Sequence, residues 1–350
     1  MDRDQFKIMV VNDKLELRNI VRNYLKNEGY TNLTISENSR SALKRARESL
    51  PDLILADADL PEMGGLDLLK AVRQDAKLAE VAFVIISGDT SQQFVARAAE
   101  FRVSGFLLKP FSNQTLVDKV GLIHDSLIHP SEGATLYQEA NQLLQNGSAE
   151  AALEKYEQAL AATRKGMAAI HYKIGRVHEV MDQEQEAEVD YERALHMSRM
   201  YVDAYDALGG LNLKWEKPDK ALEYLNKSSE ISPLNADRQL KLGEALLGAG
   251  QFEAAEKAFK LSLQLDPAQT HIFNRLGITL RRQGKLEEAG QFFLRATEVT
   301  QDDENLFFNL SRVYLDQGHK ESAVLYLEKA LALKPDFEEA RDLIQEIRSV

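Results

Sequence analysis

Small residues recur at a constant spacing of 34 positions through the second part of the chain. Three columns carry glycine, alanine or serine, and a fourth carries tyrosine, phenylalanine or leucine. Small residues at fixed points let two helices of a hairpin approach closely, and the larger residues fill the space beside them. An irregular helical bundle would not keep one spacing, so the pattern indicates stacked helical hairpins. The four columns are Gly175, Gly209, Gly243, Gly277 and Ser311; Ala187, Ala221, Ala255, Ala289 and Ala323; Ala194, Ser228, Ser262, Ala296 and Ala330; and Tyr191, Leu225, Phe259, Phe293 and Leu327.

This pattern resembles the tetratricopeptide repeat, in which each 34-residue unit is a helix–turn–helix. Pro233, Pro267 and Pro335 close three of the units, and Met167 is a single inserted residue after an earlier unit. We therefore predict an all-α solenoid that ends in a capping helix over 338–350. The six predicted units cover 133–166, 168–201, 202–235, 236–269, 270–303 and 304–337.

The first 128 residues follow a different pattern, in which short apolar runs alternate with amphipathic stretches. This alternation predicts a doubly wound α/β domain, with five parallel strands covered by helices on both faces. A short linker at 129–132, within "HPSEG", contains a proline and a glycine follows it, so the last helix should end there. The predicted strands are 7–11, 33–36, 53–57, 81–87 and 105–108, and the predicted helices lie near 14–28, 39–49, 64–74, 91–101 and 112–128.

Polar side chains stand where the predicted strands end. In "PDLILADADLPEMGG" an apolar run ends in Asp57. The other strand ends also carry polar residues: Asn12 and Asp13 follow the first strand, Ser87 ends the fourth strand, and Lys109 follows the fifth. Because the carboxyl ends of parallel strands meet at one edge of the sheet, we expect these side chains to converge. Carboxylate oxygens suit Mg²⁺, while a hydroxyl and an ammonium suit the oxygens of a phosphoryl group.

The segments "MVVND", "DLILADADLP", "VIISGD" and "GFLLKPF" resemble, in order and spacing, the signatures of the receiver domain of two-component response regulators. The resemblance covers residues 5–128 and implies a flavodoxin-like fold. It implies that Asp57 accepts the phosphoryl group and that Ser87 and Lys109 hold it. Phe106 matches the aromatic switch that turns inward on activation.

The same resemblance implies a Mg²⁺ site formed by Asp13, Asp57 and the backbone carbonyl of Asp59, with Asn12 acting through a water. The family usually has two acidic residues where this chain has Asn12 and Asp13. The loss of one negative charge should weaken Mg²⁺ binding. The extra acid Asp59 could partly restore the field or could repel a phosphodonor, and the sequence leaves both effects open.

The output of such a protein depends on the segment after the receiver. Residues 1–130 hold 17 Lys and Arg against 18 Asp and Glu, whereas residues 131–350 hold 26 against 37, a net charge of −11. An acidic array repels nucleic-acid backbones, and no DNA-binding segment remains outside the repeats, so we expect no direct DNA binding. We predict a response regulator that a sensor histidine kinase or phosphotransfer protein phosphorylates, with protein–protein interaction as its output. The alternative is a phosphorylation-independent scaffold with a degenerate receiver, for which Asn12 is the main support.

Stacked repeats form a concave face lined by the first helix of each unit. The fifth and sixth units offer amide and guanidinium groups there, which could hold a peptide backbone and an acidic side chain. A solvated surface is the competing interpretation. The candidate partner-binding residues are Asn274, Arg281, Asn305, Phe308 and Arg312.

The predicted fourth helix, "SQQFVARAAEF", offers a second contact surface. Phe94 and Phe101 lie on one face of it, and Val95 and Ala99 could supply a neighbouring core stripe. A phenylalanine left at the margin would be a docking point for the first repeat or for a second receiver in a homodimer.

Other functions find no support in the chain. It contains no cysteine, and no phosphate-binding loop, catalytic triad or metalloprotease motif occurs, so we do not expect an enzyme. The N-terminus does not resemble a signal peptide, and no apolar run approaches the ~18 residues of a membrane span. A cytoplasmic protein is the expectation.

Overall fold

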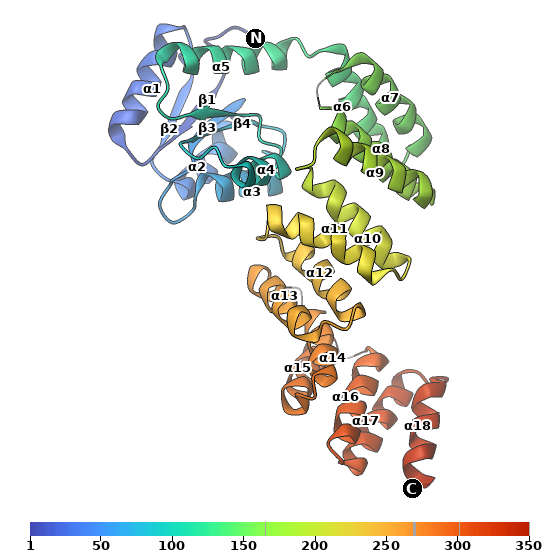
Figure 1. Ribbon diagram of the computed structural model, residues 1–350. Coiled ribbons are helices and arrows are strands. Elements are labelled where there is room, and N and C mark those ends of the chain that lie inside the picture. Colours follow the sequence, from blue (N-terminus) through green and yellow to red (C-terminus); the bar gives the residue numbers. More distant parts are fainter. Residues whose placement is uncertain (165, 269–270, 301, 350) are drawn as a thin grey trace. The chain divides into compact units, whose positions relative to one another are not determined.

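The computed structural model describes residues 1–164, 166–268, 271–300 and 302–349 (Figure 1). By its internal packing the chain divides into two compact units, Met1–Ala204 and Tyr205–Val350. The first unit holds the α/β domain and the first repeat helices, and the second holds the later repeats.

The N-terminal domain is a five-stranded parallel sheet with the strand order β2-β1-β3-β4-β5. Each predicted strand is present to within one residue, so the predicted α/β fold is confirmed. Strands β3 and β4 are buried along their whole length, as expected for central parallel strands with helices on both faces. The elements are β1 (Ile8–Val11), α1 (Leu15–Asn27), β2 (Leu33–Ser36), α2 (Ser39–Ser49), β3 (Leu53–Asp57), α3 (Gly65–Gln74), β4 (Ala82–Ser87), α4 (Gln92–Glu100), β5 (Gly105–Leu108) and α5 (Asn113–Ile128).

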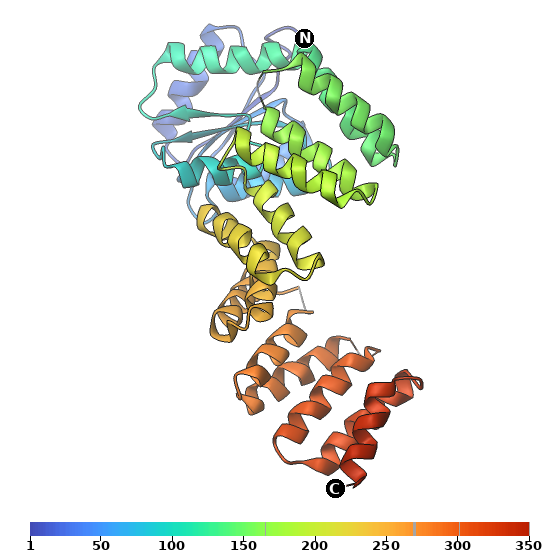
Figure 2. The same cartoon turned by 45° about the vertical axis from the view of Figure 1, so that its right-hand side comes forward.

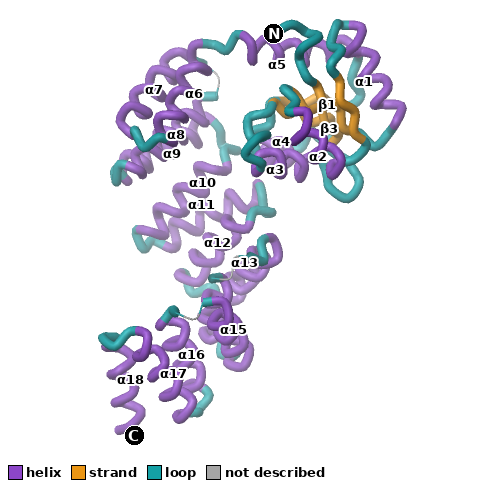
Figure 3. Tube along the Cα trace, turned by 180° about the vertical axis from the view of Figure 1, so that it is seen from behind, coloured by secondary structure: helices purple, strands orange, loops and turns teal. Residues whose placement is uncertain are grey.

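Two apolar cores lie on opposite faces of this sheet. Ile8 and Val10 of β1 pack with α1 and α5, whereas Met9 and Val11 pack with α2, α3 and α4. This division follows from the alternation of side chains along a strand. Figures 1 and 3 show the strands enclosed between these two sets of helices.

The start of α3 lies against the end of β3. A Cβ atom at Gly65 would stand 2.3 Å from the backbone carbonyl oxygen of Asp57, a distance that no side chain can occupy. Glycine is therefore required for α3 to begin here. Strand order reverses between β1 and β3, so the residues that follow these strands lie at the position where ligands bind in folds of this type.

Helices alone make up the rest of the described chain, and they follow one another as hairpins (Figure 2). Each of the six predicted units contains one helix pair, and the predicted all-α repeat architecture is confirmed. The limits of the units and the linker at 129–132 stay predictions, and α6 already begins at Glu132. The helices are α6 (Glu132–Gln145), α7 (Ala149–Ala162), α8 (Met167–Val180), α9 (Glu184–Met197), α10 (Val202–Lys214), α11 (Pro218–Ile231), α12 (Ala236–Gly248), α13 (Phe252–Leu265), α14 (Ile272–Arg282), α15 (Leu286–Val299), α16 (Glu304–Asp316), α17 (Lys320–Leu333) and α18 (Glu338–Ser349).

The glycine column meets the column of tyrosine, phenylalanine and leucine inside the second to the fifth hairpin. A Cβ atom at Gly243 would lie 2.5 Å from the ring of Phe259, and one at Gly277 would lie 2.7 Å from the ring of Phe293. The large residue of the second helix therefore occupies the space that a side chain on the first helix would need. This contact explains why both columns repeat with the same period.

Two adjacent glycines of α10 allow a direct test of this contact. Gly209→Ala places a Cβ atom 2.5 Å from Cγ of Leu225, so it should destabilise the chain by about 1–3 kcal/mol through overpacking. Gly210→Ala is the matched control, because its nearest neighbour is the flexible end of Lys241 at 3.7 Å. That variant should be stabilised by up to ~1 kcal/mol, since alanine favours a helix over glycine. Urea unfolding would measure both, and equal midpoints for the two variants would contradict the close-approach argument.

A buried ion pair joins α10 and α12. The side chain of Arg238 is fully buried, and its Nε and Nη2 atoms donate to Asp206 at 2.8–3.1 Å. Its Nη1 atom donates to the backbone carbonyl of Ser232. All three nitrogens of this guanidinium therefore have an acceptor.

No helix in the described ranges is both long and apolar enough to cross a lipid bilayer.

Candidate functional site

Asp57 is a buried carboxylate at the carboxyl end of β3, with only 2% of its surface exposed. The Lys109 ammonium lies 2.7 Å from Oδ1 and 2.6 Å from Oδ2, and the backbone N–H of Asp59 donates to Oδ1 at 3.0 Å. A buried carboxylate is costly unless an opposite charge and hydrogen bonds compensate it. Lys109 supplies that compensation, and its side chain remains 30% exposed.

Asn12 is the second side chain on Asp57. Its Nδ2 atom donates to Asp57 Oδ2 at 2.5 Å, and its Oδ1 atom accepts from the backbone N–H of Lys14 at 2.8 Å. Asn12 is almost completely buried, whereas Asp13 and Asp59 are exposed. An amide donor therefore contacts the acid at the position where the family usually places a second acid.

The sheet register brings Ser87 and Lys109 to the same edge. Asp57 pairs with Ile86, so Ser87 lies one residue further along β4. Ser87 pairs in turn with Leu108, and the N–H of Lys109 donates to the Ser87 carbonyl at 2.9 Å. The Ser87 hydroxyl is buried and accepts from the N–H of Asp89 at 2.9 Å.

The predicted switch residue, Phe106, is partly buried on β5. Its ring centroid lies 6.0 Å from that of Phe94 on α4, and Phe94 and Phe101 both pack partly against the core. The expectation that Val95 and Ala99 form a second core stripe was wrong, because both are exposed. A residue one position further along a helix is turned by about 100°, which takes these two side chains away from the sheet.

The oxygen donors near Asp57 are of the kind that Mg²⁺ takes. This ion binds through one or two carboxylates and keeps several waters, so Asp13, Asp57 and the Asp59 carbonyl could hold it. In the described residues no three acidic, cysteine or histidine side chains gather around one point, so the side chains alone do not mark a metal centre. Because Asn12 directs its nitrogen to Asp57, its carbonyl oxygen does not face the acid.

Arg18 supports the site and was not predicted from the sequence. Its Nη1 atom donates to the backbone carbonyls of Asn12 at 2.6 Å and Asp13 at 2.9 Å, which fixes the loop after β1. A single arginine near the start of a helix belongs to no motif, so the sequence did not point to this role. Gly65 was also missed, although the pair "GG" at the start of α3 was a usable signal for a close approach of backbones.

The partner-binding candidates on the repeats lie on α14 and α16. Asn274 accepts a hydrogen bond from Asn309 at 3.2 Å. Arg281 Nε forms an ion pair with Asp316 Oδ2 at 2.6 Å, without the geometry of a hydrogen bond. The structure thus joins these two candidates to neighbours that were not predicted.

The other three candidates lie on α16. Phe308 is partly buried, with its ring centroid 5.1 Å from that of Phe337. The Arg312 guanidinium lies 5.9 Å from the centre of the Phe308 ring, which is a cation–π contact. Asn305 is exposed at the start of the helix.

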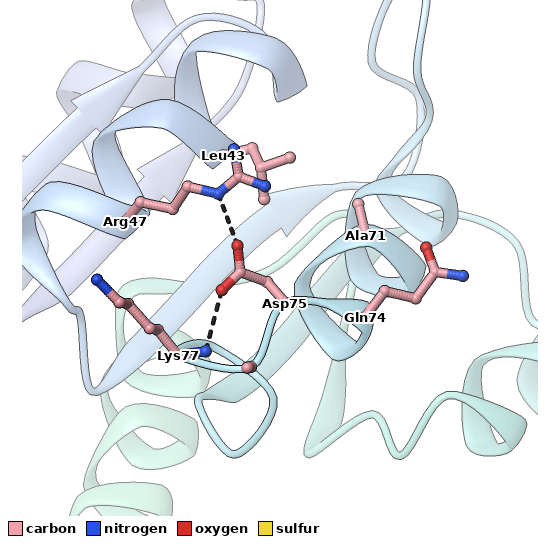
Figure 4. A pocket seen from close by; sticks show the side chains of 7 residues that line it. Leu43, Arg47, Ala71, Gln74, Asp75 and Lys77 are labelled. Atoms are coloured by element: carbon pink, nitrogen blue, oxygen red, sulfur yellow. Dashed lines mark hydrogen bonds and ion pairs between the residues drawn. The ribbon is translucent and has the colours of Figure 1, made fainter.

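A separate pocket of about 570 Å³ lies at the carboxyl ends of α2 and α3 (Figure 4). Arg47 Nε donates to Asp75 Oδ2 at 2.6 Å, and the N–H of Lys77 donates to Oδ1 at 3.0 Å. The hydrogen bond from Arg47, followed by that from Lys77, lowers the pKa of Asp75. These helix ends precede β3 and β4, so the pocket lies at the amino ends of the strands, whereas Asp57 lies at the carboxyl end of β3. Among the residues that line the pocket, no carboxylate pairs with a lysine ammonium as Asp57 does with Lys109.

A parallel α/β domain with a buried aspartate and a lysine at its carboxyl edge defines a receiver-type domain. A family model described as the response regulator receiver domain matches residues 8–121. Tetratricopeptide repeat models match residues 137–195, 213–271 and 266–336.

Known proteins resemble the two parts separately. The chain is 31% identical to the chemotaxis protein CheY of Pseudomonas aeruginosa over 119 residues, which are 34% of this chain and 96% of that protein. It is also 31% identical to CheY-3 of Vibrio cholerae over 121 residues, 35% of this chain and 93% of that protein. The solved structure of YrrB, a TPR protein with an unusual peptide-binding site, aligns with a TM-score of 0.51 and 22% identity over 55% of this chain and 99% of that one. The chain therefore belongs to the response regulator receiver family, and its receiver is followed by tetratricopeptide repeats.

Proposed function

We propose that this chain is a two-component response regulator that is phosphorylated on Asp57 by a sensor histidine kinase or a phosphotransfer protein. The observation that carries the proposal is the buried Asp57 carboxylate with the Lys109 ammonium 2.7 Å away. One carboxylate oxygen of Asp57 attacks the phosphorus of the donor, and an acyl phosphate forms as the donor group leaves. Mg²⁺ held by Asp13, Asp57 and the Asp59 carbonyl would neutralise charge on the transferring group.

Phosphorylation must rearrange the contacts of Asp57. Both carboxylate oxygens are engaged, Oδ1 by Lys109 and the Asp59 N–H, and Oδ2 by Asn12 and Lys109. A phosphoryl group adds about −1.5 to −2 charges near neutral pH. Lys109 and the Ser87 hydroxyl can then move to its oxygens, and Phe106 can turn further in.

The proposed output is protein–protein interaction through the repeats. The acidic array does not suit nucleic acid, and the receiver and repeats are modules of signalling and interaction rather than of catalysis. A partner peptide would lie along the first helices of the fifth and sixth repeats, and a homodimer is a further assembly within this proposal. The residues proposed to contact the partner peptide are Asn274, Arg281, Asn305, Phe308 and Arg312.

A phosphorylation-independent scaffold is the second candidate function. The hydrogen bond from the Asn12 amide to Asp57 favours it, because that donor partly compensates the acid without a metal or a phosphoryl group. In this case the receiver would act as a fixed interaction domain.

Labelling with acetyl phosphate in the presence of Mg²⁺ separates these candidates. We expect the wild type to incorporate one phosphoryl group, seen by intact-protein mass spectrometry, and Asp57→Asn to incorporate none. Asp59→Asn is the control, because it removes a nearby exposed carboxylate and should remain labelled. Equal labelling of the wild type and Asp57→Asn would reject Asp57, and no labelling of any form would favour the scaffold.

A further inference from the structure

Arg312 is a partly buried arginine whose guanidinium makes no hydrogen bond or ion pair with any described residue. The contact it does make is the cation–π contact with the Phe308 ring. The nitrogens of Arg312 remain in contact with solvent, and no described residue supplies them with an acceptor, so the guanidinium can donate hydrogen bonds to a ligand.

Two other arginines, the fully buried Arg238 and the partly buried Arg73, do find acceptors. Arg238 is held by Asp206 and the Ser232 carbonyl. Arg73 donates to the backbone carbonyls of residues 79, 81, 101 and 102, all at 2.9–3.0 Å. Both of these arginines join segments of the fold, and Arg312 does not.

Two further arginines reinforce the positive charge at Arg312. Burial lowers the pKa of Arg312, and the like charges of Arg281 and Arg282 lower it further, whereas Asp316 raises it. Asp316 is engaged with Arg281, and Arg282 has no ion pair or hydrogen bond among the described residues. This arginine cluster, formed by Arg281, Arg282 and Arg312, stands in an array whose net charge is −11.

The cluster has an apolar neighbour on the same helices. The partly buried ring of Phe308 lies beneath Arg312, and Ile278 and Leu315 are also partly exposed on α14 and α16. In 34-residue register these residues lie on the first helix of each unit, which lines the concave face of a repeat array. An extended ligand could place an apolar side chain on Phe308 and an acidic one at Arg312.

We propose that the fifth and sixth repeats bind an acidic peptide segment, and that the arginine cluster holds one of its carboxylates with Arg312 as the central contact. Guanidinium–carboxylate pairs are charge-assisted and often bidentate, so a ligand acid would supply the acceptors that Arg312 lacks. The inference rests on the proposed protein-interaction function and adds the chemistry of the partner.

The test uses the full chain on an array of random peptides of about twelve residues, a length that spans two repeats in extended form. We expect the bound peptides to be enriched in Asp and Glu beside an apolar residue. The double variant Arg282→Gln, Arg312→Gln should lose this enrichment and bind the best acidic peptide at least ~10-fold more weakly. Arg295→Gln is the matched control, because Arg295 makes the same kind of contact with Phe292 on the second helix α15 and should bind as the wild type does.

A stability measurement separates binding from a structural role. If Arg312 serves a ligand, Arg312→Met should melt no lower than the wild type, because it removes a partly desolvated charge that no described residue pairs with. Peptides bound without acidic enrichment, or enrichment unchanged in the double variant, would overturn the inference and leave the interaction function standing. No peptide bound by the wild type would count against both.

Discussion

Replacing Asn12 with aspartate should raise the affinity of the receiver for Mg²⁺ roughly tenfold, since the charge of the ligands sets the affinity of such sites. The same change should destabilise the metal-free protein by about 1–3 kcal/mol, because it removes a hydrogen-bond donor and adds a like charge. In the wild type the Asn12 Nδ2 atom lies 2.5 Å from Asp57 Oδ2, and both residues are buried. A carboxylate oxygen in that place needs a cation between the two acids.

The measurement is a set of thermal melts over a range of Mg²⁺ concentrations. The melting temperature of Asn12→Asp should begin below that of the wild type and rise more steeply with Mg²⁺. Asn12→Ala is the control, since it removes the same donor without adding charge, and its melt should respond to Mg²⁺ no more than the wild type does. Identical Mg²⁺ responses of the wild type and Asn12→Asp would show that position 12 does not limit metal binding.

Much of the receiver could be predicted because its signals are local. A buried parallel strand is a short run of apolar residues, and the polar residue that ends it must lie at the sheet edge. Asp57, Ser87 and Lys109 were placed in this way, and the strand register brings them together. The direction of the Asn12 amide could not be predicted, because it depends on the Lys14 N–H that competes for the amide oxygen.

In the repeats, features that recur with the period of the sequence could be predicted, whereas the contacts of individual residues could not. The meeting of Gly243 with Phe259 was predictable, because a small residue and a larger one recur at these two positions and the period gives their register. The prediction of which side of α4 is exposed was wrong, because the helix has two apolar stripes and only packing on the sheet determines which of them is buried. The hydrogen-bond acceptors of individual arginines could not be predicted either, because they belong to other repeat units.

The ion pair between Arg238 and Asp206 should contribute the largest single stability effect in the repeats. Asp206→Ala removes the carboxylate that pairs with a fully buried guanidinium, and removing one partner of a buried ion pair costs about 3–5 kcal/mol. Repeats are stabilised mainly by contacts with their neighbours. Loss of this ion pair should therefore uncouple the unfolding of the third unit from that of the fourth and broaden the unfolding transition. Urea unfolding followed by circular dichroism would show this as a lower midpoint and a less cooperative transition.

The double variant Asp206→Leu, Arg238→Met tells whether the pair stabilises the fold or merely avoids a penalty. Two apolar side chains of similar volume need no compensation, so this variant should recover most of the stability that Asp206→Ala loses. Glu230→Ala is the control, because its pair with Lys227 lies on the surface of α11 with both side chains more than half exposed, and the midpoint should not move. A double variant that remains as unstable as Asp206→Ala would mean that the directional hydrogen bonds of Arg238, rather than the balance of its charge, hold α12 against α10.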